Sequence, residues 1–344
     1  MMSTYGRRIR FKAAAVVIAL LTALLVPVAV SADSAGNDVV VVANRGSGDV
    51  SVIDSVTHEV MTVDLPGDAQ PMYVNHDYVN DLVLVGDRAA STVVALDQDS
   101  FEVVDSVTVG EGVFHQWFDD VSRRLWVVGD TSQTVTVVST RGRNLDVVAT
   151  IDIPADLVAR GGKPHDVFVK GRRAFVSILG LDDGSGVVLK YSTRRFVETG
   201  RIVTGGDPHL FMTGNQLYVA SQDASTVTRY RASSLELVAQ ATVPAAHGIF
   251  VTDSRDVFVT NITGGGPGAI TEFNRGLTRV RNVLDTTVPI PHNITVDGLE
   301  QLWVTHSGAN ANQVSIFQLG GRNPGELTTV TAGTNPFGLA AVAR

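Results

Sequence analysis

The stretch PHNITV at 291–296, followed by LWVTH at 302–306, decides the fold of this chain. Both pieces are short and rich in β-branched and aromatic residues, and a polar segment separates them. This pattern is typical of two antiparallel strands joined by a turn. His292 lies where the first predicted strand begins, and His306 lies where the second one ends.

The same unit recurs along the chain at nearly constant spacing. Its opening position is marked at seven places: Met72, His115, His165, His209, His247, His292 and Phe337. The intervals between them are 43, 50, 44, 38, 45 and 45 residues. Self-similarity at about 40–50 residues, with four short strands per unit, indicates the blades of a β-propeller. We therefore predict an all-β, seven-bladed propeller with histidine at the same place in five blades.

The two ends of the chain are incomplete in complementary ways. Three strands are predicted at 39–43, 49–53 and 59–63 with no opening strand before them, and a single strand at 337–342 follows the last complete unit. We expect this last strand to pair beside 39–43, because that pairing closes the ring and removes its open edge. Residues 38–344 would then form one propeller domain.

Residues 1–32 have the character of an export signal. Four basic residues between positions 7 and 12 precede an apolar run at 13–30, which small residues follow. We expect a signal peptide at 1–32, a short leader at 33–37 and a secreted or extracytoplasmic protein. The alternative is an uncleaved membrane anchor, since about 18 apolar residues can just span a bilayer.

Composition narrows the range of partners. The chain has no cysteine, so an exported domain depends on its core, and metal ligands would be histidine, carboxylate or methionine. The formal charge of −8 would become −12 on loss of the four basic residues of the signal. Such an acidic protein is a poor match to a phosphate backbone. We expect no nucleic-acid partner, no membrane span after cleavage, and a monomer.

The predicted second strands share a tetrad. It reads FVTN at 258–261, YVAS at 218–221, WVTH at 303–306 and VVAN at 41–44. Here the chain resembles the YVTN-type seven-bladed propellers. The segment GAITEF at 268–273 and the unit 292–306 are also similar to blades of the streptogramin (virginiamycin B) lyase family. The resemblance covers the mature chain and implies the fold, but one fold hosts many activities.

The repeated histidines are candidate metal ligands. In a propeller the first strand of each blade lines the central channel, so their shared position predicts a ring at one mouth. The five ligands expected there are His115, His165, His209, His247 and His292. Converging imidazoles suit zinc, copper or iron, and the soft thioether of Met72 favours copper. The alternative is that each imidazole bonds a neighbouring backbone carbonyl.

Two functions of different classes fit this arrangement. The first is a metal-dependent enzyme, a lyase or an oxidoreductase, acting on a small molecule in the channel mouth, where His247 or His292 moves protons. The resemblance to streptogramin lyases implies ring opening of an ester by elimination, with a divalent cation and a histidine base. That family commonly has a glutamate where this chain has His306, which makes His306 a third catalytic candidate. The second function is a non-catalytic module that binds a ligand or partner on the same face.

Overall fold

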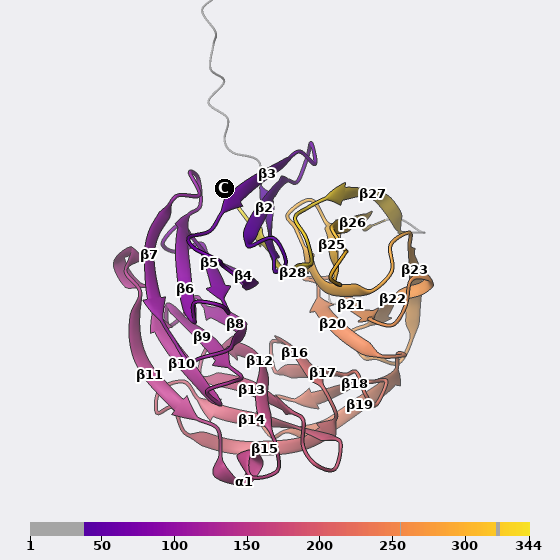
Figure 1. Cartoon of the computed structure of the whole chain (residues 1–344). Helices are drawn as coiled ribbons and strands as arrows, with labels where there is room; N and C mark the ends of the chain where they lie inside the picture. Colours follow the sequence, from indigo (N-terminus) through magenta and orange to yellow (C-terminus); the bar gives the residue numbers. More distant parts are fainter. Residues whose placement is uncertain (1–37, 255, 321–323) are drawn as a thin grey trace, which may run out of the picture. The chain divides into compact units, whose positions relative to one another are not determined.

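The computed structural model describes residues 38–254, 256–320 and 324–344. Seven four-stranded antiparallel sheets follow one another in chain order around a central channel, from indigo to yellow in Figure 1. The predicted all-β, seven-bladed propeller is confirmed. The expected signal peptide at 1–32 and leader at 33–37 lie outside the described residues. Within the described part, no helix has the length and apolar character needed to cross a bilayer.

Each blade runs from a first strand at the channel to a fourth strand at the outside (Figure 1). The first strands are β4 (Pro71–Asp77), β8 (Val113–Asp119), β12 (Lys163–Lys170), β16 (Pro208–Thr213), β20 (Ala246–Val251), β24 (Pro291–Val296) and β28 (Pro336–Val342). The second strands are β5 (Leu82–Asp87), β9 (Arg124–Gly129), β13 (Arg173–Leu179), β17 (Gln216–Ser221), β21 (Asp256–Asn261), β25 (Gln301–His306) and β1 (Val39–Asn44).

The third and fourth strands complete the same order. The third strands are β6 (Thr92–Asp97), β10 (Thr134–Ser139), β14 (Ser185–Ser192), β18 (Thr226–Arg231), β22 (Gly266–Asn274), β26 (Gln313–Gln318) and β2 (Asp49–Asp54). The fourth strands are β7 (Val103–Thr108), β11 (Asp146–Asp152), β15 (Glu198–Gly205), β19 (Glu236–Thr242), β23 (Val280–Thr286), β27 (Gly325–Thr331) and β3 (Val60–Asp64). The short helix α1 (Ala155–Val158) and a 3₁₀ turn, Arg141–Arg143, interrupt this pattern.

One blade contains both ends of the described chain. Its strand order is β28-β1-β2-β3, and β28 pairs antiparallel with β1. Val342 lies opposite Val39, and Leu339 lies opposite Val42. The predicted closure is thereby confirmed: the last strand supplies the inner edge that the three N-terminal strands lack.

Apolar side chains are buried mainly between the faces of neighbouring blades. The cluster around Trp126 of β9, for example, includes Val176 of β13 and Leu189 of β14. The second strands β1, β5 and β25 are buried along their whole length, whereas the fourth strand β3 is largely exposed. Burial on both faces explains why the second strands read as continuous apolar runs.

Six of the seven first strands are bulged near their start. In β24, Pro291 pairs with His306, and the next pair is Ile294 with Val304. A bulge re-aims side chains, and here two successive residues of the first strand, His292 and Asn293, lie opposite the single residue Thr305 of the second strand. The strand β16 pairs regularly along its length and is the exception. The first bulge residues form an outer layer at the mouth, and the second ones form an inner layer that includes Tyr73, His115, Asp166 and Asn293.

The threonine of the shared tetrad connects neighbouring blades. Thr305 Oγ1 accepts a hydrogen bond from the backbone N–H of Asn293 at 3.1 Å and donates to the carbonyl of Phe337, in the next blade, at 2.7 Å. Thr260 makes the equivalent pair of bonds to its own bulge and to the next blade. The tetrad therefore has a structural role in holding the bulged first strands together.

Replacing Thr305 by valine keeps the volume of the side chain and removes its hydroxyl. We expect a loss of about 1–3 kcal/mol in unfolding free energy, because the N–H of Asn293 stays buried without an acceptor. Chemical denaturation measures this loss, and Thr62→Val on the exposed strand β3 is the matched control. Equal stability of the two variants would contradict the bridging role.

Candidate metal centre at the mouth of the channel

The outer layer of the mouth is a closed circle of rings in contact. Four imidazoles follow one another, with centroids 4.8 Å apart for His165 and His209, 3.7 Å for His209 and His247, and 4.5 Å for His247 and His292. Phe337 continues the circle 4.4 Å from His292. The side chains of these four histidines are thus neighbours, and the mouth has a polar, imidazole half.

The other half of the circle is apolar. Phe337 lies 5.8 Å from Phe114, whose ring is 4.8 Å from His165. Met72 is fully buried in an apolar cluster with Tyr73 and Phe337. Its thioether packs against aromatic rings, so the expectation that Met72 favours copper has no support in these contacts.

His115 lies one residue deeper than the repeat predicted. Val113 of β8 pairs with Gly129 as Pro291 of β24 pairs with His306, so Phe114 occupies the position equivalent to His292. The imidazole of His115 belongs to the inner layer, where it lies 3.6 Å from the ring of Tyr73. A phenylalanine beside the histidine concealed this shift in the sequence.

A carboxylate joins two of the outer imidazoles. Asp207 Oδ1 lies 3.1 Å from His165 Nε2 and 3.4 Å from His209 Nε2, and those two nitrogens are 3.4 Å apart. In a tetrahedral site with bonds of 2.0–2.1 Å, ligand atoms are about 3.3 Å from one another. These three side chains therefore already have the spacing of three ligands around one ion.

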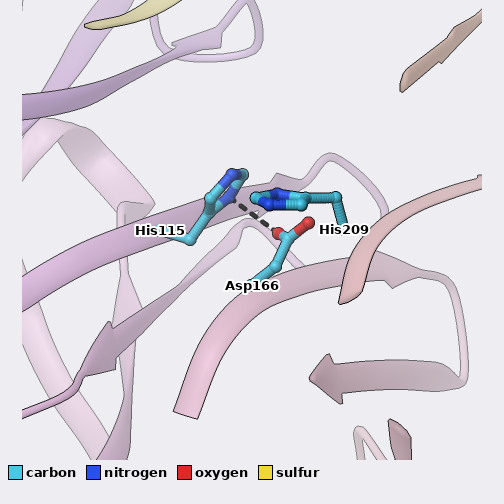
Figure 2. A group of neighbouring side chains, drawn as sticks. All are labelled: His115, Asp166 and His209. Atoms are coloured by element: carbon cyan, nitrogen blue, oxygen red, sulfur yellow. Dashed lines mark ion pairs between the residues drawn. The ribbon is translucent and has the colours of Figure 1, made fainter. Parts of the chain in front are cut away.

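A second carboxylate lies in the inner layer. Asp166 Oδ1 is 2.7 Å from His115 Nδ1, and Asp166 Oδ2 accepts the backbone N–H of Leu210 at 2.7 Å. Figure 2 shows the carboxylate of Asp166 beside the imidazoles of His115 and His209, with the dashed line marking its ion pair with His115. One ligand atom from each of these three side chains lies within 4.8 Å of the others. His209 thus belongs to both groups of possible ligands.

The charges of the two groups are coupled. Burial alone would lower the pKa of His209, but the carboxylates of Asp207 and Asp166 outweigh it, and that pKa is raised. Burial alone would also raise the pKa of each carboxyl, but His115 and His209 outweigh it at Asp166, and His209 and His165 outweigh it at Asp207. Both pKa values are lowered, so the acids are ionised. A bound cation would take the place of the His209 proton.

The remaining outer imidazoles are neutral. Burial, followed by the charge of His209, lowers the pKa of His247 well below its usual value and that of His292 to about 3. His247 Nδ1 lies 2.8 Å from Gln222 Oε1, while its Nε2 is buried without a hydrogen-bond partner among the described residues. His292 Nδ1 lies 2.9 Å from Asn293 Nδ2. His247 therefore has an unprotonated Nε2 that can accept a hydrogen bond.

His306 is fully buried but does not contact the circle. Its Nδ1 lies 2.9 Å from the carbonyl of Pro289, and its Nε2 lies 2.9 Å from Ser315 Oγ of β26. Ser315 in turn donates to Glu326 at 2.7 Å. Both nitrogens of His306 are thus engaged within its own blade and the loop beside it.

The repeat pattern did not mark the two carboxylates as candidate ligands, although both flank predicted ligands. Asp166 directly follows His165, and Asp207 precedes Pro208-His209. Asp207 has φ of 50°, a left-handed conformation that turns the chain just before β16. A search for acids adjacent to the repeated histidines would have found them.

The cluster also borders the interior of the channel. A cavity of about 290 Å³ lies there, lined by His115, Asp166 and His209 and by aromatic side chains that include Trp117 and Phe211. Asp207, by contrast, has 21% of its side chain exposed at the mouth. A small molecule in the channel would contact the group of Asp166, and a small molecule at the mouth would contact the group of Asp207.

The fold and this cluster define the chain as a seven-bladed propeller with a histidine–carboxylate cluster at one end of its channel. No protein-family model matches the sequence, and no curated protein does. Membership of the YVTN-type or streptogramin lyase families therefore has no support from these comparisons.

Solved structures share the fold over nearly their whole length. The periplasmic gluconolactonase of Pseudomonas aeruginosa is 17% identical, with a TM-score of 0.69 over 89% of this chain and 99% of that one. A Bacteroides fragilis protein with proposed 6-phosphogluconolactonase activity is 14% identical, with a TM-score of 0.72 over 90% and 99%. A Desulfotomaculum acetoxidans protein of unknown function is 15% identical, with a TM-score of 0.71 over 89% and 99%. Identities this low show the fold alone and do not support the predicted lyase or oxidoreductase type.

Proposed function

We propose that this protein is a metal-dependent hydrolase that opens a cyclic ester at the histidine mouth of its channel. The observation that carries the proposal is the spacing of His165, Asp207 and His209, whose ligand atoms are 3.1, 3.4 and 3.4 Å apart. Three protein ligands with a fourth position left for water or substrate are typical of catalytic zinc sites, whereas structural sites use four.

The residues have separate roles in this proposal. His165, His209 and Asp207 hold the ion. A divalent ion supplies Lewis acidity, which polarises an ester carbonyl and makes water more acidic. His247, beside His209 in the circle, is kept neutral by burial, so its Nε2 would accept a hydrogen bond from the attacking water and orient it. His115 and Asp166 hold His209 from the inner side.

The class of substrate is proposed from two considerations. Several solved propellers of this fold, including two described above, are named for lactone hydrolysis. Ester hydrolysis also needs only water, a Lewis acid and an acceptor for the water's hydrogen bond; a bound ion would supply the Lewis acid, and His247 would supply the acceptor. Zinc is the preferred ion because two imidazoles and one carboxylate form a ligand set without a soft sulfur donor.

The protein is proposed to act outside the cytoplasm as a monomer. The basic and apolar character of residues 1–32 supports export, and one neighbour of the same fold is periplasmic. The absence of cysteine from the whole sequence is compatible with either compartment.

The test combines metal analysis with hydrolysis. Protein purified without a histidine tag is expected to hold about one equivalent of metal per chain and to hydrolyse five- or six-membered lactones, followed by pH-stat above the spontaneous rate. A strong chelator should abolish the hydrolysis, and added Zn²⁺ should restore it. Protein that neither retains nor binds metal would overturn the proposal. Metal binding without turnover on any lactone would favour the non-catalytic, ligand-binding alternative.

A further inference from the structure

Two arginines lie over the apolar half of the mouth. Arg45 directly follows β1 and Arg88 directly follows β5, which are the second strands of neighbouring blades. The guanidinium carbon of Arg45 is 5.4 Å from the ring centroid of Phe337, and that of Arg88 is 5.9 Å from the centroid of Phe114. Because those two rings are 5.8 Å apart, both cations cover one continuous aromatic surface.

The two cations differ in their counter-ions. Arg88 forms a bidentate pair with Asp130, with both N–O distances at 3.0 Å, and also donates to the carbonyl of Gly112 at 3.1 Å. Both oxygens of Asp130 are thus used. Among the described residues, Arg45 has no carboxylate within ion-pair distance; its guanidinium lies over the ring of Phe337, and the charge of Asp130 reaches it only from a greater distance.

The charge of Arg45 is only partly compensated by Asp130. Partial burial, followed by the like charge of Arg88, lowers the pKa of Arg45. A guanidinium in such a place is stabilised when an anion replaces the missing carboxylate, since its planar donors match carboxylate and phosphate oxygens in pairs. In a chain with a formal charge of −8, Arg45 is thus a cation without an ion-pair partner among the described residues, at the same mouth as the histidine circle.

We propose that Arg45 and the ring of Phe337 form a subsite for an anionic oxygen group, a carboxylate or a phosphate, on the molecule that enters the histidine mouth. That this molecule is the substrate rests on the proposed function. The subsite itself requires neither metal nor turnover. Phe337 lies 4.4 Å from His292 in the same circle, so the subsite borders the imidazole half. The preferred substrate is then a cyclic ester that carries an acidic group, rather than a neutral one.

The test measures binding of unreactive anions with the metal removed. Calorimetric titrations at low ionic strength, with a chelator present, compare the binding of benzoate with that of its neutral isostere benzamide. A separate series of titrations measures the binding of inorganic phosphate. The variants are Arg45→Gln, Arg45→Lys and, as the matched control, Arg172→Gln. Arg172 is exposed in the turn between β12 and β13, on the face opposite the histidine mouth.

We expect the wild type to bind benzoate or phosphate but not benzamide, with affinity that falls as salt is added. Arg45→Gln should lower the affinity for the anion by about 10- to 100-fold, as expected for loss of a charged hydrogen bond. Arg45→Lys should keep part of that affinity, and Arg172→Gln should keep all of it. Whichever of benzoate and phosphate binds more tightly shows whether the subsite prefers a carboxylate or a phosphate. The subsite is refuted if neither anion binds the wild type at millimolar concentration, or if Arg45→Gln binds as tightly with an unchanged melting temperature. Because metal is absent throughout, failure of lactone hydrolysis leaves this outcome unaffected.

Discussion

Replacing His209 by alanine is expected to remove the metal and the hydrolytic activity together. His209 is the side chain shared by the group with Asp207 and the group with Asp166, so its loss breaks both. Loss of an outer-shell partner alone typically lowers metal affinity 10–100-fold, so loss of this ligand should lower it by more than about 100-fold. Metal content after dialysis and the pH-stat rate measure the two effects.

Three further variants make this result specific. Asp207→Asn should lose metal as His209→Ala does, because the amide supplies no negative charge at the third ligand position. His247→Ala should keep the metal and lose turnover, since His247 contacts His209 but belongs to neither ligand group. His76→Ala, which loses a bond to Gln98 and a ring contact with Tyr78 but no contact with the circle, is the control and should change neither. Full metal content in His209→Ala, or loss of metal in His247→Ala equal to that in His209→Ala, would contradict the assigned ligand set.

The buried charges make one side effect predictable. Without His209, the carboxylates of Asp166 and Asp207 lose a compensating cation, so burial should raise their pKa values toward the protonated form. His209→Gln keeps a polar side chain at that position and separates this electrostatic effect from loss of volume. If His209→Gln folds and lacks metal, the loss of metal is due to the loss of a ligand and not to the loss of the fold.

Deleting residues 336–344 should destroy cooperative unfolding. The deletion removes β28, exposes the edge of β1, and leaves Thr305 without the carbonyl of Phe337 that it bonds at 2.7 Å. It also opens the circle of blades between β24 and β4, so apolar faces on both sides become exposed. Thermal melting followed by circular dichroism should show a broad, low transition or aggregation.

Removing only residues 343 and 344 is the matched control for this deletion. It leaves β28 intact and takes away mainly the exposed contacts of Arg344 with Asp99 and Asp38. The control should melt within a few degrees of the full chain. A protein lacking 336–344 that melted as cooperatively and as high as the control would show that the closing strand is dispensable.

The repeat itself was enough to predict the architecture. Strands of constant number at a period near 45 residues can bury their faces only by stacking on neighbours around an axis, so the blade count and the closing pairing of 337–342 with 39–43 followed from spacing. The approximate location of His165, His209, His247 and His292 followed as well, because a repeated position in a repeated unit recurs at the same place around the channel.

The chemistry of the mouth depended on features that no repeat reveals. Whether Phe114 or His115 entered the outer circle was decided by the pairing of Val113 with Gly129, a matter of one residue in register. Asp207 reaches His165 and His209 because the backbone turns back at φ 50° just before β16. Arg45 and Arg88 come from loops 43 residues apart in the sequence and meet over one aromatic surface.

The sequence by itself determined the propeller, its closure and a circle of imidazoles, because these depend on periodicity, and periodicity is visible along one dimension. The tertiary structure alone decided which acids pair with which imidazoles, which histidine is shared, and that Arg45 has no carboxylate partner among the described residues. Those features depend on distances of a few ångströms between different blades. Such distances are set by bulges and single turns of the backbone, which shift a side chain by a whole layer without changing the repeat.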